Sequence, residues 1–313
     1  MKNEFFKDAI TAINKGKTFA IFFHNSPDGD AIGSAKAVEH LLKNHGKKSY
    51  LYCEDDVSFE CKFICDGFEQ DQSKLCECDT YICLDVSGLN RVGKYADYLT
   101  DKNKSIIVID HHVPQDNFGD IICRDSDASS TGELIYNLYT EMNEPIDKEA
   151  ALYIYVAVSS DTGCFVQTNT KPSTFECASK LIQLGADTQK ANYELFVKRP
   201  EGYINIAKYA FKNLQVFGDK LSLVTIDYKT YKKLGEPQSF YFIDALRFYP
   251  TDVLVVAIQK EKTFVKLSAR SRNYNVQKLC EKLGGGGHIN ASGAGKEGKL
   301  KDIIKIIKKE LNV

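Results

Sequence analysis

Three apolar segments of this sequence each run into side chains of the kind that bind metal ions. Residues 19–23 are followed by His24, residues 81–84 by Asp85, and residues 105–109 by Asp110. Apolar segments separated by helical patterns are typical of buried parallel strands, whose carboxyl ends form the ligand crevice of an α/β fold. The sequence therefore predicts that acids and imidazoles collect at one sheet edge, and the further candidates are Asp28, Asp30, His111, His112 and Asp161.

Taken one at a time, these residues have ordinary structural explanations. Residues 26–29, Ser-Pro-Asp-Gly, are typical of a turn, and Asp30 could serve only to cap the helix that follows. Asp85 could simply end a strand, and Asp161 a helix. The joint pattern, with paired histidines directly after a buried strand, favours a shared metal site.

The ligand types also indicate which metal and which chemistry. Carboxylates and imidazoles without a thiolate favour Mn²⁺ or Mg²⁺, with Zn²⁺ and Fe²⁺ as alternatives. These candidate side chains exceed the needs of one ion, and so many acids repel one another unless cations neutralise them. Two ions about 3.5–4 Å apart, bridged by a carboxylate, would lower the pKa of a shared water and neutralise charge on a phosphoryl oxygen. The chemistry implied is hydrolysis of a phosphate ester.

The apolar patterning predicts an α/β fold for the first part of the chain. A helix is expected over residues 30–43, where apolar side chains recur every three or four positions. Strands alternate with helix-like stretches or turns, which predicts a parallel sheet covered on both faces. The expected strands are residues 18–23, 49–53, 81–84, 105–109 and 120–123.

Residues 129–196 are mostly helical in pattern. Ser130 followed by Glu133 resembles a capping box, and two more helices are expected over residues 147–160 and 173–184, the second ended by Gly185. A second, smaller α/β domain follows, with strands at 221–227, 252–258 and 263–268 and helices at 275–283 and 300–311. The predicted organisation is a catalytic domain over residues 1–190, a linker or connecting helix over 191–212, and a substrate-binding domain over 213–313, with the active site in a cleft between the domains.

The composition excludes several classes of protein. The chain of 313 residues is 43% hydrophobic and 27% charged, which is ordinary globular usage and rules out wholesale disorder. A net charge of −1 argues against a protein that coats long nucleic acid. No apolar run approaches the ~18–20 residues of a membrane helix, and ten cysteines without an export signal suggest reduced thiols in the cytoplasm.

The C-terminal part of the chain has the character of an anion-binding surface. From residue 259 onward, 13 Lys and Arg stand against 5 Asp and Glu. Four consecutive glycines, Gly284, Gly285, Gly286 and Gly287, can adopt positive φ and offer their N–H groups to a phosphate. A flexible hinge is the alternative explanation, but the neighbouring His288 and the basic Arg270 favour anion binding.

At this level of detail the sequence resembles the DHH phosphoesterases. Their four motifs are matched by His24-x-x-x-Asp28-x-Asp30, Asp85, Asp110-His111-His112 and Asp161. The C-terminal module called DHHA1 is matched by residues 265–271, Val-Lys-Leu-Ser-Ala-Arg-Ser, by 284–288 and by 291–293. The chain looks most like the nanoRNase/pAp phosphatase group, in which these two domains stand alone. One departure is Val166, where that group often has a basic residue.

The resemblance implies a role for each candidate. His24 and Asp28 would hold one metal ion, Asp30, His111 and Asp161 the other, and Asp85 both. Asp110 would orient a neighbouring histidine. His112 would face the scissile phosphate, neutralising its charge or protonating the leaving oxygen. Substrate would be bound by Arg270, Ser271, Gly284, Gly285, Gly286, Gly287 and His288.

The resemblance also implies the substrates. They would be short single-stranded RNA or DNA oligonucleotides of about two to five nucleotides, linear dinucleotides and adenosine 3′,5′-bisphosphate (pAp), with release of a nucleoside monophosphate. The cofactors would be two divalent cations, Mn²⁺ by preference, and a homodimer through the first domain is plausible. A phosphodiesterase for cyclic dinucleotides is the rival enzyme, and a nucleotide-sensing module without hydrolysis is a more distant alternative.

Overall fold

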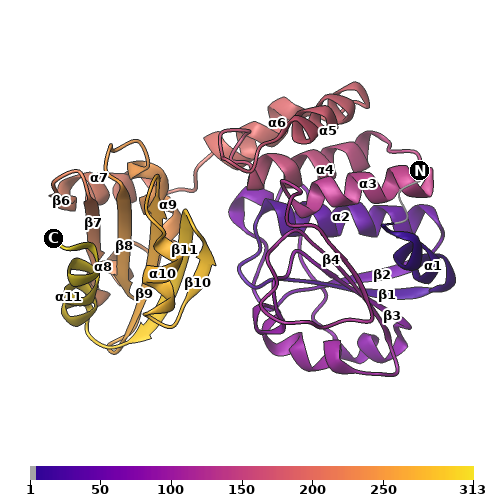
Figure 1. Ribbon diagram of the computed structural model, residues 1–313, viewed down its shortest axis with the longest axis horizontal. Helices are drawn as coiled ribbons and strands as arrows, with labels where there is room; N and C mark the ends of the chain where they lie inside the picture. The colour runs from indigo at the N-terminus through magenta and orange to yellow at the C-terminus, as the bar shows by residue number, and fades with distance from the viewer. Residues whose placement is uncertain (1–4) are drawn as a thin grey trace. The chain divides into compact units, whose positions relative to one another are not determined.

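The computed structural model describes residues 5–313 and divides them into two compact units (Figure 1). The first unit ends at Arg199 and the second begins at Pro200. The predicted connecting segment, residues 191–212, spans this point. It contains α6 (Thr188–Asn192) in part, a π-helical turn (Tyr193–Val197) and most of α7 (Tyr203–Asn213).

The first unit is built on a sheet of five parallel strands in the order β2-β1-β3-β4-β5. Alternate residues of β1 enter two separate cores: Phe19, Ile21 and Phe23 enter one, and Ala20 and Phe22 the other. Both sheet faces are therefore covered, as the continuous apolar strands predict. The strands are β1 (Thr18–Phe23), β2 (Lys48–Tyr52), β3 (Thr80–Leu84), β4 (Ser105–Asp110) and β5 (Ile121–Arg124).

Helices cover one face of this sheet, and short 3₁₀ segments cover the other (Figure 1). The helical face carries α1 (Lys7–Lys15), α2 (Gly29–Asn44), α3 (Thr131–Met142) and α4 (Lys148–Asp161), with α5 (Pro172–Gln183) packed on α4. The opposite face carries the 3₁₀ segments Gln72–Glu77 and Gly93–Thr100. The predicted helices at 30–43, 147–160 and 173–184 are present with their ends shifted by one or two residues.

The predicted capping box at α3 is only half right. The Ser130 hydroxyl accepts a hydrogen bond from the Glu133 N–H at 3.1 Å, as expected. The Glu133 carboxylate accepts from the N–H of Ser129 at 3.0 Å, one residue before the cap. Glu133 is buried there beside the Ser129 hydroxyl, which also donates to it, so tertiary packing has displaced the local bond.

The second unit holds a mixed sheet of six strands in the order β10-β11-β9-β8-β7-β6, in which only β7 and β8 run parallel. The sequence predicted three of its strands: β7 (Leu221–Ile226), β8 (Val253–Gln259) and β9 (Phe264–Ser271). It missed β6 (Gln215–Phe217), β10 (Gly286–His288) and β11 (Ala291–Glu297), of which β10 and β11 are rich in glycine. The helices are α7, α8 (Tyr228–Lys233), α9 (Ser239–Leu246), α10 (Val276–Glu281) and α11 (Leu300–Leu311).

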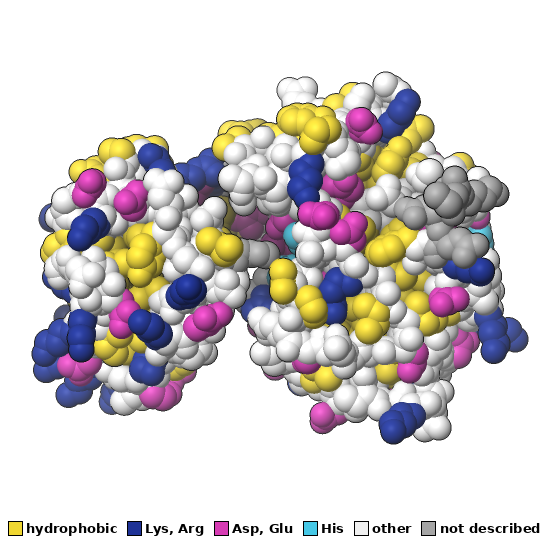
Figure 2. Space-filling view, viewed as in Figure 1, with side chains coloured by type: hydrophobic (Ala, Val, Ile, Leu, Met, Phe, Trp, Pro, Cys, Tyr) yellow, Lys and Arg dark blue, Asp and Glu magenta, His cyan; other side chains and the backbone are white. Residues whose placement is uncertain are grey.

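The basic C-terminal part of the chain is visible on the surface of the second unit. Lys and Arg side chains gather at the lower left of Figure 2, where α11 lies. This helix buries Ile303, Ile307 and Leu311 and carries Lys301, Lys305, Lys308 and Lys309. Among residues 5–313, no helix has both the length and the apolar character needed to cross a lipid bilayer.

The close approach of α2 to α4 depends on a glycine. A Cβ atom added at Gly33 would lie 2.6 Å from the Tyr153 carbonyl oxygen and 2.9 Å from the Ala157 nitrogen. These are backbone atoms of a buried helix and cannot rotate away. This contact sets the position of α2, whose first turn carries Asp30, and of α4, which ends in Asp161.

We therefore predict that Gly33→Ala lowers the free energy of unfolding. Overpacking of a core costs about 1–3 kcal/mol, which outweighs the gain of about 1 kcal/mol in helix propensity. The free energy of unfolding is measured by urea denaturation. Gly67→Ala is the control, because the Cβ atom added there meets nothing within 4 Å. If Gly33→Ala were as stable as Gly67→Ala, this account of the α2–α4 contact would be wrong.

Candidate metal centre

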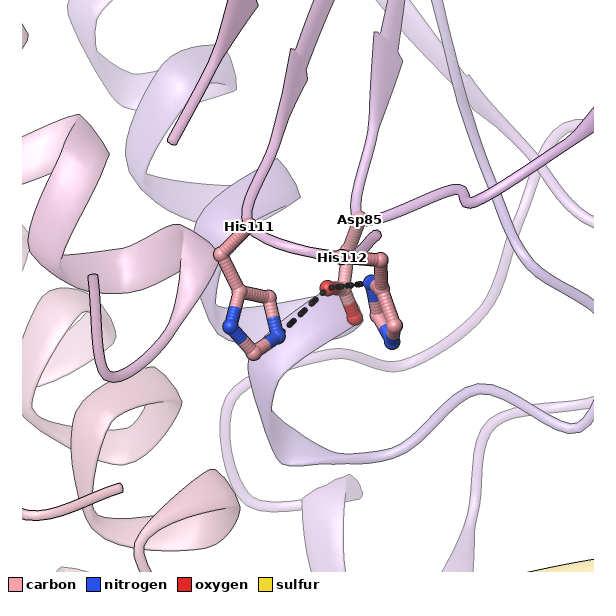
Figure 3. A group of neighbouring side chains, drawn as sticks. All are labelled: Asp85, His111 and His112. Carbon is pink, nitrogen blue, oxygen red and sulfur yellow. Dashed lines mark ion pairs between the residues drawn. The ribbon is translucent and has the colours of Figure 1, made fainter. Parts of the chain in front are cut away.

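The predicted metal-type residues lie together at the carboxyl edge of the five-stranded sheet. His24 follows β1, Asp85 follows β3, and His111 and His112 follow β4. The order of the strands reverses between β1 and β3, and the carboxyl ends at such a reversal form the binding crevice of doubly wound folds. Figure 3 shows the Asp85 carboxylate between the rings of His111 and His112.

One group at this edge consists of His24, Asp28 and Asp85. The Nε2 atom of His24 lies 3.4 Å from Asp85 Oδ2 and 3.7 Å from Asp28 Oδ1. Asp28 is also the N-cap of α2 and accepts from the N–H groups of Asp30 and Ala31 at 3.0 and 3.2 Å. The helix cap that the sequence offered to Asp30 therefore belongs to Asp28, and the two bonds hold the Asp28 carboxylate beside His24.

A second group consists of Asp30, His111 and Asp161. The Nε2 atom of His111 lies 3.7 Å from Asp30 Oδ2 and 3.7 Å from Asp161 Oδ2. It also lies 3.6 Å from Asp85 Oδ1, whereas Asp85 Oδ2 faces His24. Asp85 therefore presents one oxygen to each group, and its φ of 59° places it in the left-handed region that a non-glycine residue rarely adopts.

The spacing within these groups fits divalent metal ions better than hydrogen bonds. His111 Nε2 is buried and has no hydrogen-bond partner. Three carboxylate oxygens surround it at 3.6–3.7 Å, which is too long for a hydrogen bond. Two ligands that each lie about 2.1 Å from the same ion are separated by about 3.0–3.4 Å, close to these gaps. The donors are oxygen and imidazole nitrogen, a set that suits hard and borderline divalent cations.

The N-terminus of α3 holds two of the carboxylates in place. The N–H groups of Thr131 and Gly132 donate to Asp30 at 2.8 and 2.9 Å, and the Thr131 hydroxyl donates to Asp85 Oδ1 at 2.9 Å. The positive end of the helix dipole favours negative charge at this position. Sequence reasoning gave Thr131 no role at the site, because its partners lie 46 and 101 residues away along the chain.

Asn169 fixes the carboxylate of Asp161. Its Nδ2 donates to Asp161 Oδ2 at 2.9 Å and to the Ser129 carbonyl at 2.8 Å. The chain reaches this position by turning sharply after α4, where Gly163, Cys164 and Phe165 all have positive φ. Such backbone is strained and clusters at functional sites. Asp161 does end a helix, α4, as its alternative explanation held, but no local pattern pointed to Asn169.

Asp110 belongs to neither group. It is fully buried, and its Oδ1 lies 2.8 Å from His112 Nδ1, while its Oδ2 accepts from the Nε–H of Arg124 at 2.9 Å. The contact with His112 is the one that an orienting role for Asp110 requires. Arg124, the last residue of β5, was not among the predicted site residues.

Burial and crowding shift the pKa values of these side chains in opposite directions. Burial raises the pKa of Asp30 well above its usual value, and it raises the pKa of Asp161 to about 6. Burial also favours the neutral form of Asp85, but the neighbouring imidazoles outweigh it and hold the pKa of Asp85 below its usual value. Burial acts against protonation of His24, yet Asp28 and Asp85 raise its pKa to about 10. A divalent cation would replace the protons that these groups share.

Comparison with known proteins shows which domains are present. The DHH family, N-terminal domain, matches residues 18–158, and the DHHA1 domain matches residues 244–313. The chain contains a DHH domain and a DHHA1 domain. The first match contains β1 to β5 and most of α4, and the second begins within α9 and runs through α11.

Related proteins align with this DHH protein over most of its length. It is 27% identical over 308 residues to the "bifunctional oligoribonuclease and PAP phosphatase NrnA" of Mycoplasma pneumoniae, covering 96% of this chain and 94% of that protein. It is 25% identical over 307 residues to the "cyclic-di-AMP phosphodiesterase PdeA" of Listeria monocytogenes, covering 90% of this chain but 44% of that protein. The fold matches an exopolyphosphatase-related protein from Bacteroides fragilis with a TM-score of 0.90 and 24% identity, covering 98% of this chain and 95% of that one.

In the DHHA1 part of this DHH protein, five of the predicted substrate residues lie on β9 and β10, which β11 separates in the sheet. Arg270 and Ser271 end β9, and the register joins His288 to Ala291 and Ala291 to Arg270. Burial lowers the pKa of Arg270 from its usual value. The binding role of these residues stays a prediction.

The glycine run differs from the expected open loop. The N–H groups of Gly284 and Gly285 donate to the carbonyls of Glu281 and Cys280 at 3.0 and 2.9 Å, ending α10, while Gly286 and Gly287 belong to β10. The first two N–H groups are therefore already bonded within the protein. If the glycine run binds a phosphate, it would do so through Gly286 and Gly287.

We predict that Thr131→Val weakens metal binding without removing a ligand. Loss of the hydroxyl frees Asp85 to rotate, and loss of such a supporting bond costs about 10–100-fold in metal affinity. Calorimetric titration of Mn²⁺ checks this, with Thr131→Ser as the control that keeps the hydroxyl. Equal affinities for Thr131→Val and the wild-type protein would contradict a supporting role for Thr131.

Proposed function

We propose that this protein is a two-ion phosphoesterase that hydrolyses very short RNA and linear dinucleotides to nucleoside monophosphates and converts pAp to AMP. The observation that carries the proposal is the position of Asp85, with one carboxylate oxygen toward each of two metal-type groups. The name of the Mycoplasma pneumoniae relative, which aligns over nearly the whole of both chains, supports this choice of substrates.

We further propose that the active protein binds two Mn²⁺ ions, with Mg²⁺ as the alternative. His24, Asp28 and Asp85 would hold one ion, and Asp30, His111, Asp161 and Asp85 the other; these residues form the two groups described above. Imidazole nitrogen in both groups favours Mn²⁺ over Mg²⁺, which prefers oxygen. Once bound, the ions would supply an acidified water and neutralise charge on the phosphoryl oxygens.

The protein's own residues then have separate tasks in this proposal. Asp30 and Asp85 accept hydrogen bonds from the first turn of α3, which would hold both carboxylates in place. His112, whose Nδ1 faces Asp110, would use its Nε2 to protonate the leaving oxygen. Arg270, Ser271, His288 and the glycine run, Gly284 to Gly287, would bind the remaining phosphate or nucleotide.

The charge of the chain agrees with a short substrate. A net charge of −1 cannot neutralise many phosphates at once, whereas a mono- or dinucleotide presents only a few. The positive charge is concentrated in the C-terminal part of the chain, where the second phosphate of such a substrate would be bound. We place the protein in the cytoplasm, because its ten unpaired cysteines suit a reducing compartment.

Hydrolysis of a cyclic dinucleotide is the second candidate. It would use the same ions and differ only in how the substrate is held, and the Listeria monocytogenes relative favours it. That relative is more than twice as long as the segment matched here, so its activity has less weight than that of the Mycoplasma protein.

We predict that Asp85→Ala abolishes turnover while the protein stays folded. The change removes a carboxylate from both groups and relieves repulsion among the remaining acids. Mn²⁺ binding by calorimetry and hydrolysis of pAp should both be lost, whereas Asp66→Ala, an exposed acid in a loop, should behave as wild type. Near-normal turnover by Asp85→Ala would rule out a shared ligand.

The substrate assignment is tested with a panel at fixed Mn²⁺. RNAs of two to ten nucleotides, pAp, the linear dinucleotide pApA and cyclic di-AMP are compared by kcat/KM. We expect the highest values for the shortest linear RNAs and pAp, with a steep fall as length increases. Preferred cleavage of cyclic di-AMP would favour the second candidate, and binding of any substrate without hydrolysis would indicate a sensing module.

A further inference from the structure

Arg124 lies directly beside the metal centre without facing it. It is the last residue of β5, and the strand register pairs it with Asp110 at the end of β4. Its side chain is 9% exposed, and its Nε–H donates to Asp110 Oδ2 at 2.9 Å. Burial of a guanidinium costs free energy unless its charge is paired, and here Asp110 provides the pair.

Asp110 holds the ring of His112 through one nitrogen. Its Oδ2 accepts from Arg124, and its Oδ1 accepts from the backbone N–H of His112 at 3.1 Å and lies 2.8 Å from His112 Nδ1. Because Asp110 occupies Nδ1, any contact of this ring with a substrate is made through Nε2.

His112 has a second arrangement within reach. Its Nδ1 lies only 3.5 Å from Asp85 Oδ1, and Asp85, His111 and His112 together form a third group with metal-type spacing. A small rotation of the ring would exchange Asp110 for Asp85 and bring His112 among the metal ligands. The contact between Arg124 and Asp110 fixes the Asp110 carboxylate and so decides between the two arrangements.

We propose that Arg124 is a positioning residue that, through Asp110, keeps the His112 ring out of the metal-ligand set and directs Nε2 at the leaving oxygen of the substrate. This rests on the phosphoesterase function proposed above. In that reaction the water gives up one proton to solvent and its oxygen forms a bond to phosphorus. The bond from phosphorus to the ribose oxygen breaks, and this oxygen takes the Nε2 proton of His112, which solvent later restores.

The first test separates binding from catalysis. We expect Arg124→Ala to lower kcat for pApA by about 10–100-fold, with KM and Mn²⁺ affinity unchanged within about threefold. Arg124→Lys should recover part of the loss. Lys171→Ala, which breaks an exposed ion pair with Asp127, is the matched control and should change none of these values. A loss of Mn²⁺ affinity as large as the loss of kcat would overturn the proposal.

A double-mutant cycle tests whether Arg124 acts through His112. In a His112→Ala background, Arg124→Ala should have no further effect on kcat beyond about twofold. Independent effects, in which the two losses multiply, would mean that Arg124 only stabilises the end of β5.

A substrate with an activated leaving group provides a further readout. The p-nitrophenyl ester of thymidine 5′-phosphate releases p-nitrophenolate, which needs no proton. The defect of Arg124→Ala should therefore shrink to about threefold or less on this ester. The same defect on pApA and on the ester would contradict a role in protonating the leaving oxygen.

The ring orientation can also be measured without turnover. Long-range ¹H–¹⁵N NMR spectra report the tautomer of each histidine, and comparison with His112→Ala identifies the His112 signals. We expect a hydrogen on Nδ1 in the wild-type protein and altered His112 nitrogen shifts in Arg124→Ala and Arg124→Lys. The two proposals can fail separately. Absence of phosphate ester hydrolysis by the wild-type protein would rule out the proposed function. Unchanged His112 nitrogen shifts in Arg124→Ala would rule out the positioning role of Arg124.

Discussion

The repulsion among four converging carboxylates, two of them buried, is the constraint on which this structure depends. Asp28, Asp30, Asp85 and Asp161 converge on two imidazoles at one sheet edge, and Asp30 and Asp85 are 1% and 2% exposed. Water cannot screen charges that are buried in this way. The N-terminus of α3 opposes the repulsion by donating two N–H groups to Asp30, and divalent cations would oppose it more strongly.

The fold makes this concentration of charge tolerable. Parallel strands deliver His24, Asp85 and Asp110–His112 to one edge, and the first turn of α2 and the last turn of α4 complete the site. The glycine contact between α2 and α4 sets the distance between Asp30 and Asp161, which both lie 3.7 Å from the same nitrogen of His111. Packing far from the ions therefore controls geometry within the site.

The residues that the sequence could predict are those that follow a local pattern. An apolar run ending in His24 or in Asp110-His111-His112 can be recognised because strand and ligand are adjacent in the chain. Thr131, Asn169 and Arg124 could not be found in this way, because each contacts its partner through the fold. The glycine run was misjudged for the opposite reason: a local pattern suggested free N–H groups, but α10 uses two of them for its own end. The resemblance to DHH proteins supplied the roles that spacing alone left open.

The central claim is that Asp85 joins two metal ions. Anomalous diffraction from crystals grown with Mn²⁺ tests it most directly, because it locates each ion independently of the protein atoms. The account predicts two peaks per chain about 3.5–4 Å apart, with one Asp85 oxygen next to each. A single peak, or two peaks of which neither touches Asp85, would contradict it.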